Sequence, residues 1–278
     1  MKATVAPGPA PVKTEAALRV VTPLMEAPVA NRPNWTIARL ITEIEAHEGV
    51  RIGKSQLSEA LRKNFRWRRP RHTLKGRQNA GEIARVGLRL QLRKAQAEAG
   101  GIVLLYGDES EALTHPYLAR AWARCGADLR VPAPGQAKKV AIGSLNHVTR
   151  QLIVHTSATK RSSDFIAHLV QLDHLYGPQP GRPIKPVVLV EDNGPIHVSK
   201  LTRKALEARK HWLTVEWLPK YAPELNDIEV VWRDLKAHHL AHQTFTDHAA
   251  LDCAIHVAVE ALNNERCLHP LGNRIISA

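Results

Sequence analysis

Three acidic residues stand in settings where carboxylates can meet around metal ions. Asp108 ends the stretch Ile-Val-Leu-Leu-Tyr-Gly-Asp, and Asp192 follows the apolar run Val-Val-Leu-Val-Glu. Both settings predict a carboxylate at the C-terminal end of a buried strand, where open α/β sheets carry their sites. Glu229 falls in the first turn of a predicted helix, after a stop signal that contains Pro219 and Pro223. Because hard divalent cations take oxygen ligands, the three carboxylates predict a site for two ions, Mg²⁺ or Mn²⁺.

Spacing alone leaves the third ligand open. Glu224 and Asp227 lie close to Glu229 in the chain, so each is a rival for that position. Asp108, taken singly, is more often a turn residue or a helix cap than a ligand. His197 either lies beside the ions or caps the helix that follows it.

The positive charge of the chain is concentrated in its N-terminal third. The 278 residues carry a formal net charge of +13. Residues 1–100 contain 19 Lys and Arg against 8 Asp and Glu, whereas residues 101–278 contain 20 against 18. A basic surface of this kind attracts polyanions. The surface that binds a polyanion is therefore predicted to lie in the first third of the chain.

Several classes of protein are disfavoured by what the sequence lacks. The three cysteines are an odd number without a C-x-x-C pair, which argues against a disulfide framework and a cysteine-based zinc site. No apolar run approaches the roughly 20 residues that cross a bilayer, and the first 30 residues lack the features of a secretory signal. No G-x-x-x-x-G-K-S/T motif is present, so we expect no nucleotide cofactor. We expect a soluble, cytoplasmic protein with no membrane partner.

Composition divides the chain into four stretches. Residues 1–33 are rich in Ala, Pro and Val with little periodicity, which predicts a flexible lead-in. Residues 34–78 predict a helix-turn-helix domain with a basic extension, and residues 79–100 predict a basic amphipathic linker helix. Residues 101–278 alternate strand and helix patterns, which is typical of a single catalytic domain.

The helix-turn-helix prediction rests on two short helical patterns with a break between them. Apolar residues recur at helical spacing over 37–44, Gly49 follows, and a second helix begins near Ser55. A basic run without acidic residues occupies 62–77, and it is suited either to a phosphate backbone and minor groove or to a solvated linker. Trp67 in this run is interpreted as a linker anchor rather than a base-stacking platform. The residues predicted to contact DNA are Ser55, Gln56, Arg62, Lys63, Arg66, Arg68, Arg69, Arg71, Lys75 and Arg77.

The order of elements after residue 100 predicts a ribonuclease-H-like α/β fold. That order is strand, strand, strand, helix, strand, helix, strand, helix. Strands are predicted over 102–106, 138–146, 151–156, 187–190 and 213–217, and helices over 163–176, 199–209, 227–239 and 249–262. The predicted class is a mixed sheet with flanking helices, preceded by a small all-α helix-turn-helix domain.

Two motifs give the chain a resemblance to a known family. One is Asp192-Asn193-Gly-Pro-Ile-His197, and the other runs Leu-Pro-Lys-Tyr-Ala-Pro-Glu-Leu-Asn-Asp-Ile-Glu-Val-Val-Trp over 218–232. Between Asp192 and Glu229 there are 36 residues. In sequence and spacing these motifs resemble the DDE transposases of the mariner superfamily, in particular its bacterial insertion-sequence branch. The resemblance extends from the helix-turn-helix through most of the chain.

The resemblance implies a function and roles for individual residues. Asp108, Asp192 and Glu229 would be the catalytic acids and metal ligands, with Glu229 at the Ile-Glu position of the motif. The residues implied around them are Glu109, Asn193 and His197. The implied reaction is two-metal phosphoryl transfer, in which DNA is cleaved at terminal inverted repeats and its ends are transferred into target DNA. A homodimer would bring the two ends together, in the cytoplasm of a bacterium and in association with its nucleoid.

The chain departs from the family in two ways. Asp227 stands where the family usually has Pro, and residues 1–33 do not resemble the additional helix-turn-helix unit that usually comes first. The second departure favours a truncated or frame-disrupted copy that is weak in recognising its own ends. One rival function is therefore a decayed or domesticated protein that binds inverted repeats without cutting, or represses. A structure-directed nuclease of the same fold is another.

Overall fold

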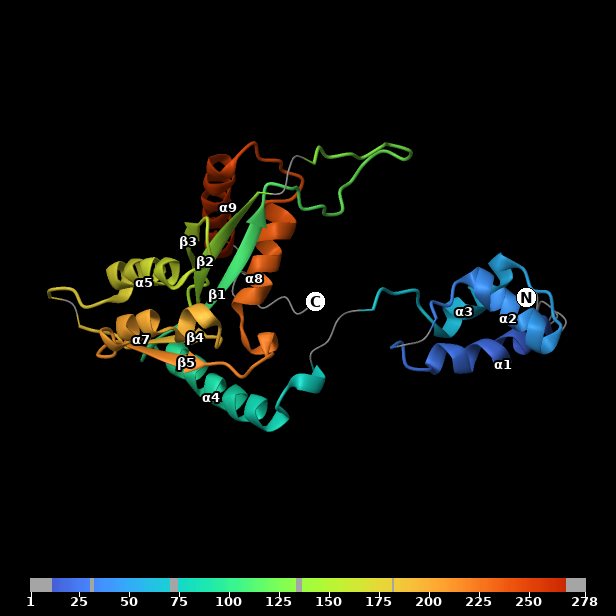
Figure 1. The fold of residues 1–278 in the computed structure, drawn as a ribbon, viewed down its shortest axis with the longest axis horizontal. Coiled ribbons are helices and arrows are strands. Elements are labelled where there is room, and N and C mark those ends of the chain that lie inside the picture. Colours follow the sequence, from blue (N-terminus) through green and yellow to red (C-terminus); the bar gives the residue numbers. More distant parts are fainter. Residues whose placement is uncertain (1–11, 31–32, 71–74, 134–136, 182, 269–278) are drawn as a thin grey trace, which may run out of the picture. The chain divides into compact units, whose positions relative to one another are not determined.

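The chain divides into two compact units, which are described separately. In the computed structural model, the described residues are 12–30, 33–70, 75–133, 137–181 and 183–268. The units are Met1–Thr73 and Leu74–Ala278 (Figure 1). The division falls within the basic run, a few residues before the boundary at 78 that composition predicts.

The first unit is a small bundle of three helices. These are α1 (Val12–Glu26), α2 (Ile37–Glu48) and α3 (Lys54–Asn64). The Thr36 side chain caps α2 by accepting a hydrogen bond from a backbone N–H of its first turn. Gly49 ends α2 with a φ of 64°, a left-handed conformation that glycine adopts at little cost. The short connection leads into α3, so α2 and α3 are consistent with the expected helix-turn-helix.

The flexible lead-in expected over 1–33 is wrong for its central part, which forms α1. Ala17 and Val21 of α1 are fully buried, in one core with Leu40 of α2. These small apolar side chains give little periodic signal in the sequence, but they allow α1 to pack closely on the other helices. Residues 1–11 lie outside the described part of the chain.

The second unit is built on a five-stranded mixed sheet. Its strands are β1 (Val103–Leu113), β2 (Lys138–Asn146), β3 (Leu152–Ser157), β4 (Val187–Glu191) and β5 (Leu213–Trp217). Their order across the sheet is β3-β2-β1-β4-β5. Strands β1, β2 and β3 pair antiparallel, whereas β4 is parallel to both β1 and β5. The predicted mixed sheet is therefore confirmed.

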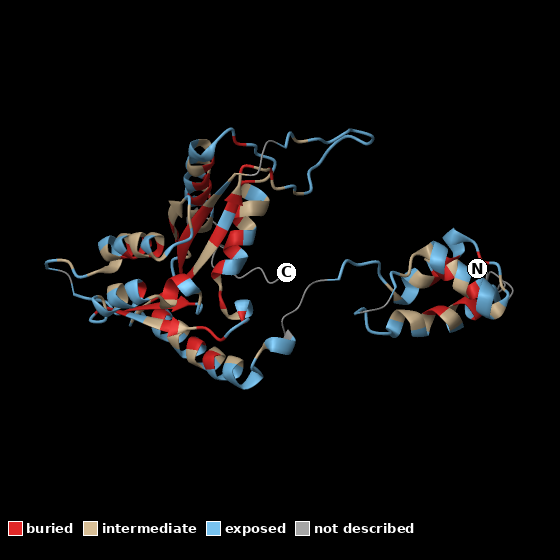
Figure 2. Ribbon diagram, in the orientation of Figure 1, coloured by how far each residue is buried: buried red, intermediate tan, exposed pale blue. Residues whose placement is uncertain are grey.

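Helices cover both faces of this sheet. One face carries α4 (Ala80–Glu98), α8 (Ile228–Asp234) and α9 (His248–Leu268), and the other carries α5 (Ser162–Tyr176), α6 (Pro195–Val198) and α7 (Lys200–Glu207). Because successive strand residues point to opposite faces, Tyr106 of β1 enters the first core and Leu105 the second. Figure 2 shows the strands as the most buried part of the unit.

Short helical turns complete the second unit. They are η1 (Lys75–Arg77) and η2 (Pro223–Leu225), together with the π-helix η3 (Leu235–His239) directly after α8. The long helix predicted over 227–239 is thus an α-helix that becomes a π-helix in its last turn. The predicted helix over 249–262 extends further, to Leu268.

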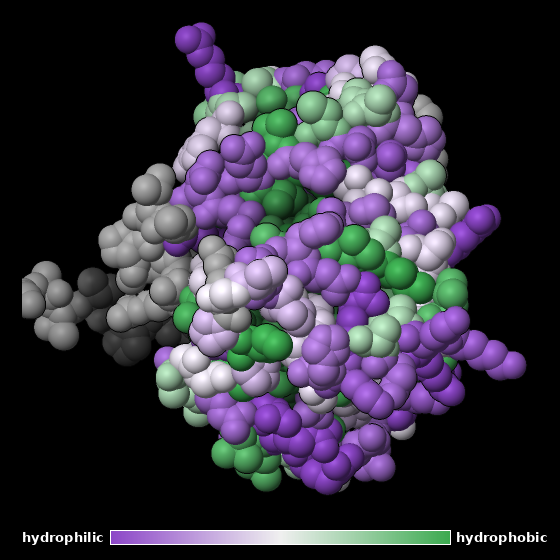
Figure 3. Space-filling view, turned by 90° about the vertical axis from the view of Figure 1, so that its left-hand side faces the viewer, coloured by the Kyte–Doolittle hydropathy of each residue, from purple (hydrophilic) through white to green (hydrophobic). Residues whose placement is uncertain are grey.

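One face of the molecule is largely hydrophilic. Figure 3 shows one face of the molecule, on which hydrophilic residues surround small separate apolar patches. The connection between β1 and β2 makes a long excursion, visible in Figure 1, in which Trp122 is fully exposed. None of the described helices combines the length and apolarity needed to cross a membrane.

Candidate active site

Asp108 lies within β1, and the expectation that it ends a strand is wrong. β1 continues past it because β2 pairs antiparallel along this length, with Asp108 opposite Gly143. The parallel pairing of β1 with β4 ends earlier, at Tyr106 and Val190. Asp108 therefore lies just beyond the part of β1 that pairs with β4. Asp192 directly follows the end of β4, so the two acids lie at the same edge of this pairing.

The three acids singled out in the sequence line one cavity of about 490 Å³. They come from three elements, since Asp108 belongs to β1, Asp192 follows β4, and Glu229 lies in the first turn of α8. A second cavity of about 570 Å³ shares Asp108 and Glu229 with the first. Among the described residues, neither Glu224 nor Asp227 lines either cavity.

The two rivals for the third acid are held by other partners. Glu224 accepts hydrogen bonds from the Gln78 amide, at 3.0 and 3.4 Å. Asp227 is paired with Lys94 of α4, whose Nζ lies 2.9 and 3.2 Å from its two oxygens. Burial would raise the pKa of Asp227, but its partners, among them Lys94, lower it below the usual value. These contacts favour Glu229 as the third acid of the site.

Backbone-directed hydrogen bonds fix the segments that carry the acids. Asp192 accepts a 2.7 Å bond from the Gly194 N–H through Oδ1, which closes a tight turn after β4. The Asn193 amide donates to the Leu218 carbonyl at the end of β5, also at 2.7 Å. These two bonds hold the Asp192 segment against the end of β4 and the end of β5.

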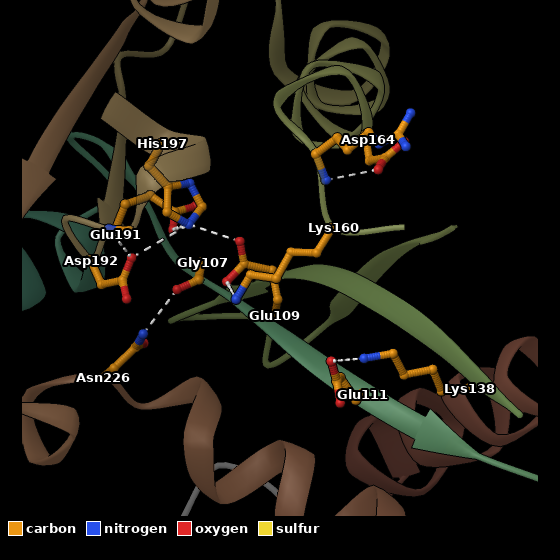
Figure 4. Close-up of polar contacts among 12 residues, drawn as sticks. Gly107, Glu109, Glu111, Lys138, Lys160, Asp164, Glu191, Asp192, His197 and Asn226 are labelled. Atoms are coloured by element: carbon orange, nitrogen blue, oxygen red, sulfur yellow. Dashed lines mark hydrogen bonds and ion pairs between the residues drawn. The ribbon is translucent and has the colours of Figure 1, made fainter. Parts of the chain in front are cut away.

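Asn226 ties the segment before α8 to the central strand. Its buried amide donates a 2.9 Å hydrogen bond to the Gly107 carbonyl, beside Asp108 (Figure 4). Asn226 lies within the motif over 218–232, and no role for it was predicted from the sequence. Its partner, 119 residues away in the chain, could not be predicted from the sequence.

His197 forms the centre of a buried acidic cluster behind the cavity. Its Nε2 lies 2.9 Å from Glu109, 3.6 Å from Glu191 and 3.5 Å from Asp192 (Figure 4). Lys160 approaches the other oxygen of Glu109, at 3.2 Å. The structure thus brings Glu109 and His197 beside Asp192, as expected, and adds Glu191.

Charges in this cluster depend on burial and on the partners together. Burial would lower the pKa of His197, but Glu191 and Glu109 raise it to about 9. Burial would raise the pKa of Glu109, but His197 and Lys160 lower it. Burial raises the pKa of Glu191 well above its usual value. Near neutral pH we therefore expect an imidazolium–carboxylate pair between His197 and Glu109.

Gly107 leaves room for the carboxyl group of Glu191. A Cβ atom at position 107 would collide with the Glu191 carboxylate, which is completely buried. Glu191 therefore fills the space beside β1 that a side chain at position 107 would need.

The carboxylates match the chemistry of a hard cation. Burial raises the pKa of Asp108 to about 7, and repulsion from Glu229 adds to the effect. Burial also raises the pKa of Glu229. Among the described residues, no three acidic, histidine or cysteine side chains are grouped so that they could hold a metal ion as they are placed. Asp108 and Glu229 still fit a divalent cation by donor type, because a cation would relieve the repulsion that disfavours their charged forms.

The raised pKa of Asp108 predicts a pH-dependent difference in stability. In the metal-free folded protein this carboxyl keeps its proton up to about pH 7, whereas in the unfolded chain it ionises near 3.8. Unfolding releases a proton between these values, so this group makes the wild type less stable as pH rises to about 7. Across that window, the free energy of unfolding of Asp108→Asn should therefore rise relative to that of the wild type, by up to about 1.4 kcal/mol per pH unit.

Denaturant unfolding of both proteins in EDTA, at a series of pH values from 4 to 9, measures this difference. The free energy of unfolding of Asp108→Asn minus that of the wild type should increase up to about pH 7 and stay constant above it. A gap that is the same at every pH would contradict the raised pKa.

The predicted DNA contacts are distributed over both units. Those exposed in the first unit are Ser55, Gln56, Arg62, Lys63, Arg66, Arg68 and Arg69. Lys75 and Arg77 belong to η1 in the second unit, and Arg71 lies outside the described residues. Trp67, interpreted from the sequence as a linker anchor, is 80% exposed. It lines two cavities together with apolar residues of the first unit, among them Met25 and Trp35.

The fold and the three-acid cavity together define a class of protein. The sheet order and the flanking helices are those of the ribonuclease-H-like DDE transposase fold. The family described as DDE superfamily endonuclease matches residues 103–252, which is more than half of the chain, and the chain belongs to this family. No curated protein sequence matches it.

Solved structures of similar fold cover nearly the whole chain. The "Mos1 transposase paired-end complex with left transposon end" matches with a TM-score of 0.58 and 16% identity, over 96% of this chain and 81% of that chain. The "Mos1 Strand Transfer Complex" gives 0.57 and 16%, over 99% and 82%. The "Mos1 mariner paired end complex with Mn" gives 0.55 and 16%, over 96% and 81%. At this identity the likeness is one of fold.

Proposed function

We propose that this protein is a DNA transposase of the mariner superfamily, from its bacterial insertion-sequence branch. The observation that carries the proposal is the convergence of Asp108, Asp192 and Glu229 on one cavity in a DDE-family chain. The reaction is cleavage of DNA at terminal inverted repeats, followed by transfer of the ends into target DNA. The motifs around Asp192 and Glu229 support the assignment to this branch.

Asp108, Asp192 and Glu229 would hold two Mg²⁺ or Mn²⁺ ions. The fold is shared with a Mos1 mariner complex solved with Mn, which supports this metal class. Two such ions would activate the attacking oxygen and stabilise the leaving oxygen of an in-line displacement at phosphorus. Glu109, Asn193 and His197 would orient the Asp192 segment, because they contact that segment or fix it to β5.

The protein's own residues also have to bring DNA to this cavity. The exposed face of α3 with Ser55 and Gln56 would read base edges, and the arginines after it would follow the phosphate backbone. A homodimer would hold the two transposon ends at once. These activities belong in the bacterial cytoplasm, on the nucleoid.

Cleavage of a plasmid that carries the gene's own flanking DNA tests the proposal. With Mg²⁺ or Mn²⁺ the protein should cut at the flanks, and EDTA should stop the reaction. Binding to the flanks without cutting would instead favour the non-catalytic repressor. Cutting of branched or hybrid substrates without regard to the flanks would favour the structure-directed nuclease.

The double change Arg68→Ala and Arg69→Ala is expected to weaken DNA binding equally for all sequences. Both side chains are exposed, and each would release condensed cations on meeting a phosphate. The slope of log K against log salt concentration should therefore fall in magnitude by about two.

Titrations at several salt concentrations measure that slope. The matched control is Arg203→Ala with Lys204→Ala, two exposed basic residues on α7 that line neither cavity. A slope unchanged from the wild type would remove Arg68 and Arg69 from the DNA contact.

A further inference from the structure

Asp227 uses its side chain differently from most acidic residues at the start of a helix. It directly precedes α8, two residues before Glu229, and a carboxylate at that place commonly accepts a hydrogen bond from the first turn of the helix. At the described start of α8, Asp227 makes no such capping bond. Its carboxylate instead accepts hydrogen bonds from Lys94, so the side chain connects the start of α8 to α4.

The contact between Lys94 and Asp227 is shielded and involves both carboxylate oxygens. Nζ lies 3.2 Å from Oδ1 and 2.9 Å from Oδ2. The Lys94 side chain is 29% exposed and the Asp227 side chain 15%. The same Nζ lies 5.5 Å from the centre of the Tyr106 ring, which is fully buried in β1. An ion pair shielded in this way is weakened less by water and salt than an exposed pair.

The turn between β2 and β3 contributes a third element to the surroundings of Asp227. Nδ1 of His147, in this turn, lies 3.8 Å from Oδ2 of Asp227. The other ring nitrogen of His147, Nε2, lies 3.2 Å from Glu98 at the end of α4. Residues of α4, of the β2–β3 turn and of the segment before α8 therefore meet at Asp227.

The neighbours of Asp227 in the chain hold the same segment to the sheet. Asn226 donates its 2.9 Å hydrogen bond to the Gly107 carbonyl, and Ile228 is fully buried in the core. Asn226 thus connects the segment to β1, while Asp227 connects it to α4. Because Glu229 lies in the first turn of α8, a shift of that turn would displace its carboxylate in the cavity. Functional side chains have to be held within about 0.5 Å of their working positions.

We propose that Asp227 is a positioning residue for Glu229 and that it acts through Lys94. The ion pair holds the first turn of α8 where Glu229 meets Asp108 and Asp192 in one cavity. Asp227 lies outside the lining of that cavity and acts on the metal ions only through Glu229. This inference rests on the proposed function, in which Glu229 is a metal ligand.

Two substitutions remove the link from opposite ends. Lys94→Met removes the ammonium group and keeps the length of the side chain. Asp227→Pro removes the carboxylate and introduces the residue that is usual in the family. The backbone accepts proline there, because Asp227 has a φ of −62° and Asn226 has the extended conformation, with φ −107° and ψ 102°, that a residue before proline prefers.

The first test measures binding of Mn²⁺ to the metal-free protein, by the loss of the electron paramagnetic resonance signal of free Mn²⁺. Lys94→Met and Asp227→Pro should each bind Mn²⁺ about 10-fold more weakly than the wild type, as is typical when a residue that orients a metal ligand is lost. The double variant should bind no more weakly than either single variant, because each removes the same link. Lys94→Arg keeps the charge and should retain most of the affinity.

Lys210→Met is the control, because it breaks an exposed ion pair, with Glu207, outside both cavities. It should bind Mn²⁺ as the wild type does. A Lys94–Asp227 pair that only stabilised the fold would leave the affinity of the folded protein unchanged. Wild-type affinity in both Lys94→Met and Asp227→Pro would therefore overturn the inference, and so would losses that multiply in the double variant.

Hydrogen exchange without metal or DNA separates this inference from the proposed function. In EDTA, the backbone amides of α8 should exchange faster in Lys94→Met and Asp227→Pro than in the wild type, whereas those of α7 should not change. Faster exchange in α8 of a protein that binds no Mn²⁺ and cuts no DNA would retain the link and reject the transposase. Equal exchange in α8 of the variants and the wild type would overturn the link even in an active enzyme.

Discussion

Asp192→Asn is expected to lower the rate of DNA cleavage at least about 100-fold while the protein stays folded and bound to DNA. Loss of a residue that only orients a metal ligand typically costs 10- to 100-fold, so loss of a ligand should reach at least the upper end of that range. Asn has nearly the same shape, and its amide oxygen can still accept the 2.7 Å bond from the Gly194 N–H. The turn after β4 is therefore expected to persist.

Initial rates of flank cleavage with Mg²⁺ or Mn²⁺, together with a DNA-binding titration, measure the two parts of this result. Glu229→Gln should behave in the same way, since its side chain lines the same cavity. The matched control is Glu207→Gln, because Glu207 is exposed on α7, pairs with Lys210 and lines neither cavity. Cleavage by Asp192→Asn within about threefold of the wild type would exclude Asp192 as a ligand.

Trp232→Ala is expected to cost about 3–5 kcal/mol of the free energy of unfolding of the second unit. Trp232 is 3% exposed, and its ring fills the space over β2 next to Gly143, where a Cβ would come within 2.6 Å of it. Removing the ring leaves a void beneath α8, the helix that carries Glu229. The surrounding strands are held in the sheet and can close such a void only in part.

Denaturant unfolding followed by circular dichroism measures this change, in the transition that belongs to the second unit. Trp122→Ala is the control, because it removes the same side chain from a fully exposed position and should change the stability by less than about 0.5 kcal/mol. A loss below about 1 kcal/mol for Trp232→Ala would mean that the ring does not support α8 as described.

The alternation of apolar runs and helical patterns was sufficient to predict the sheet and most helices of the second unit. The positions of Asp192 after β4 and of Glu229 at the start of α8 were also predictable, because each follows a clear boundary in the sequence. The extent of β1 was not predictable in the same way. Beyond Tyr106 the strand is polar, and it continues only because β2 pairs with it through Leu113.

Residues whose roles depend on distant partners could not be predicted. The periodicity around Lys94 shows a helix, but nothing local shows that Lys94 meets Asp227, 133 residues later. The same holds for Asn226 and Gly107. The helix α1 was not predicted, because its buried residues are the small side chains Ala16, Ala17 and Val21, which give a weak periodic signal.

Gly107 and Glu191 also constrain how this sequence can change over generations. A side chain at position 107 and the carboxyl end of Glu191 compete for one volume, so a chain that gains the first must displace or replace the second. The two substitutions are therefore not interchangeable in order. A lineage in which position 191 shortens first passes through a folded protein with a small void, whereas the reverse order forces the buried Glu191 carboxyl group out of its place in the sheet, next to Asp108.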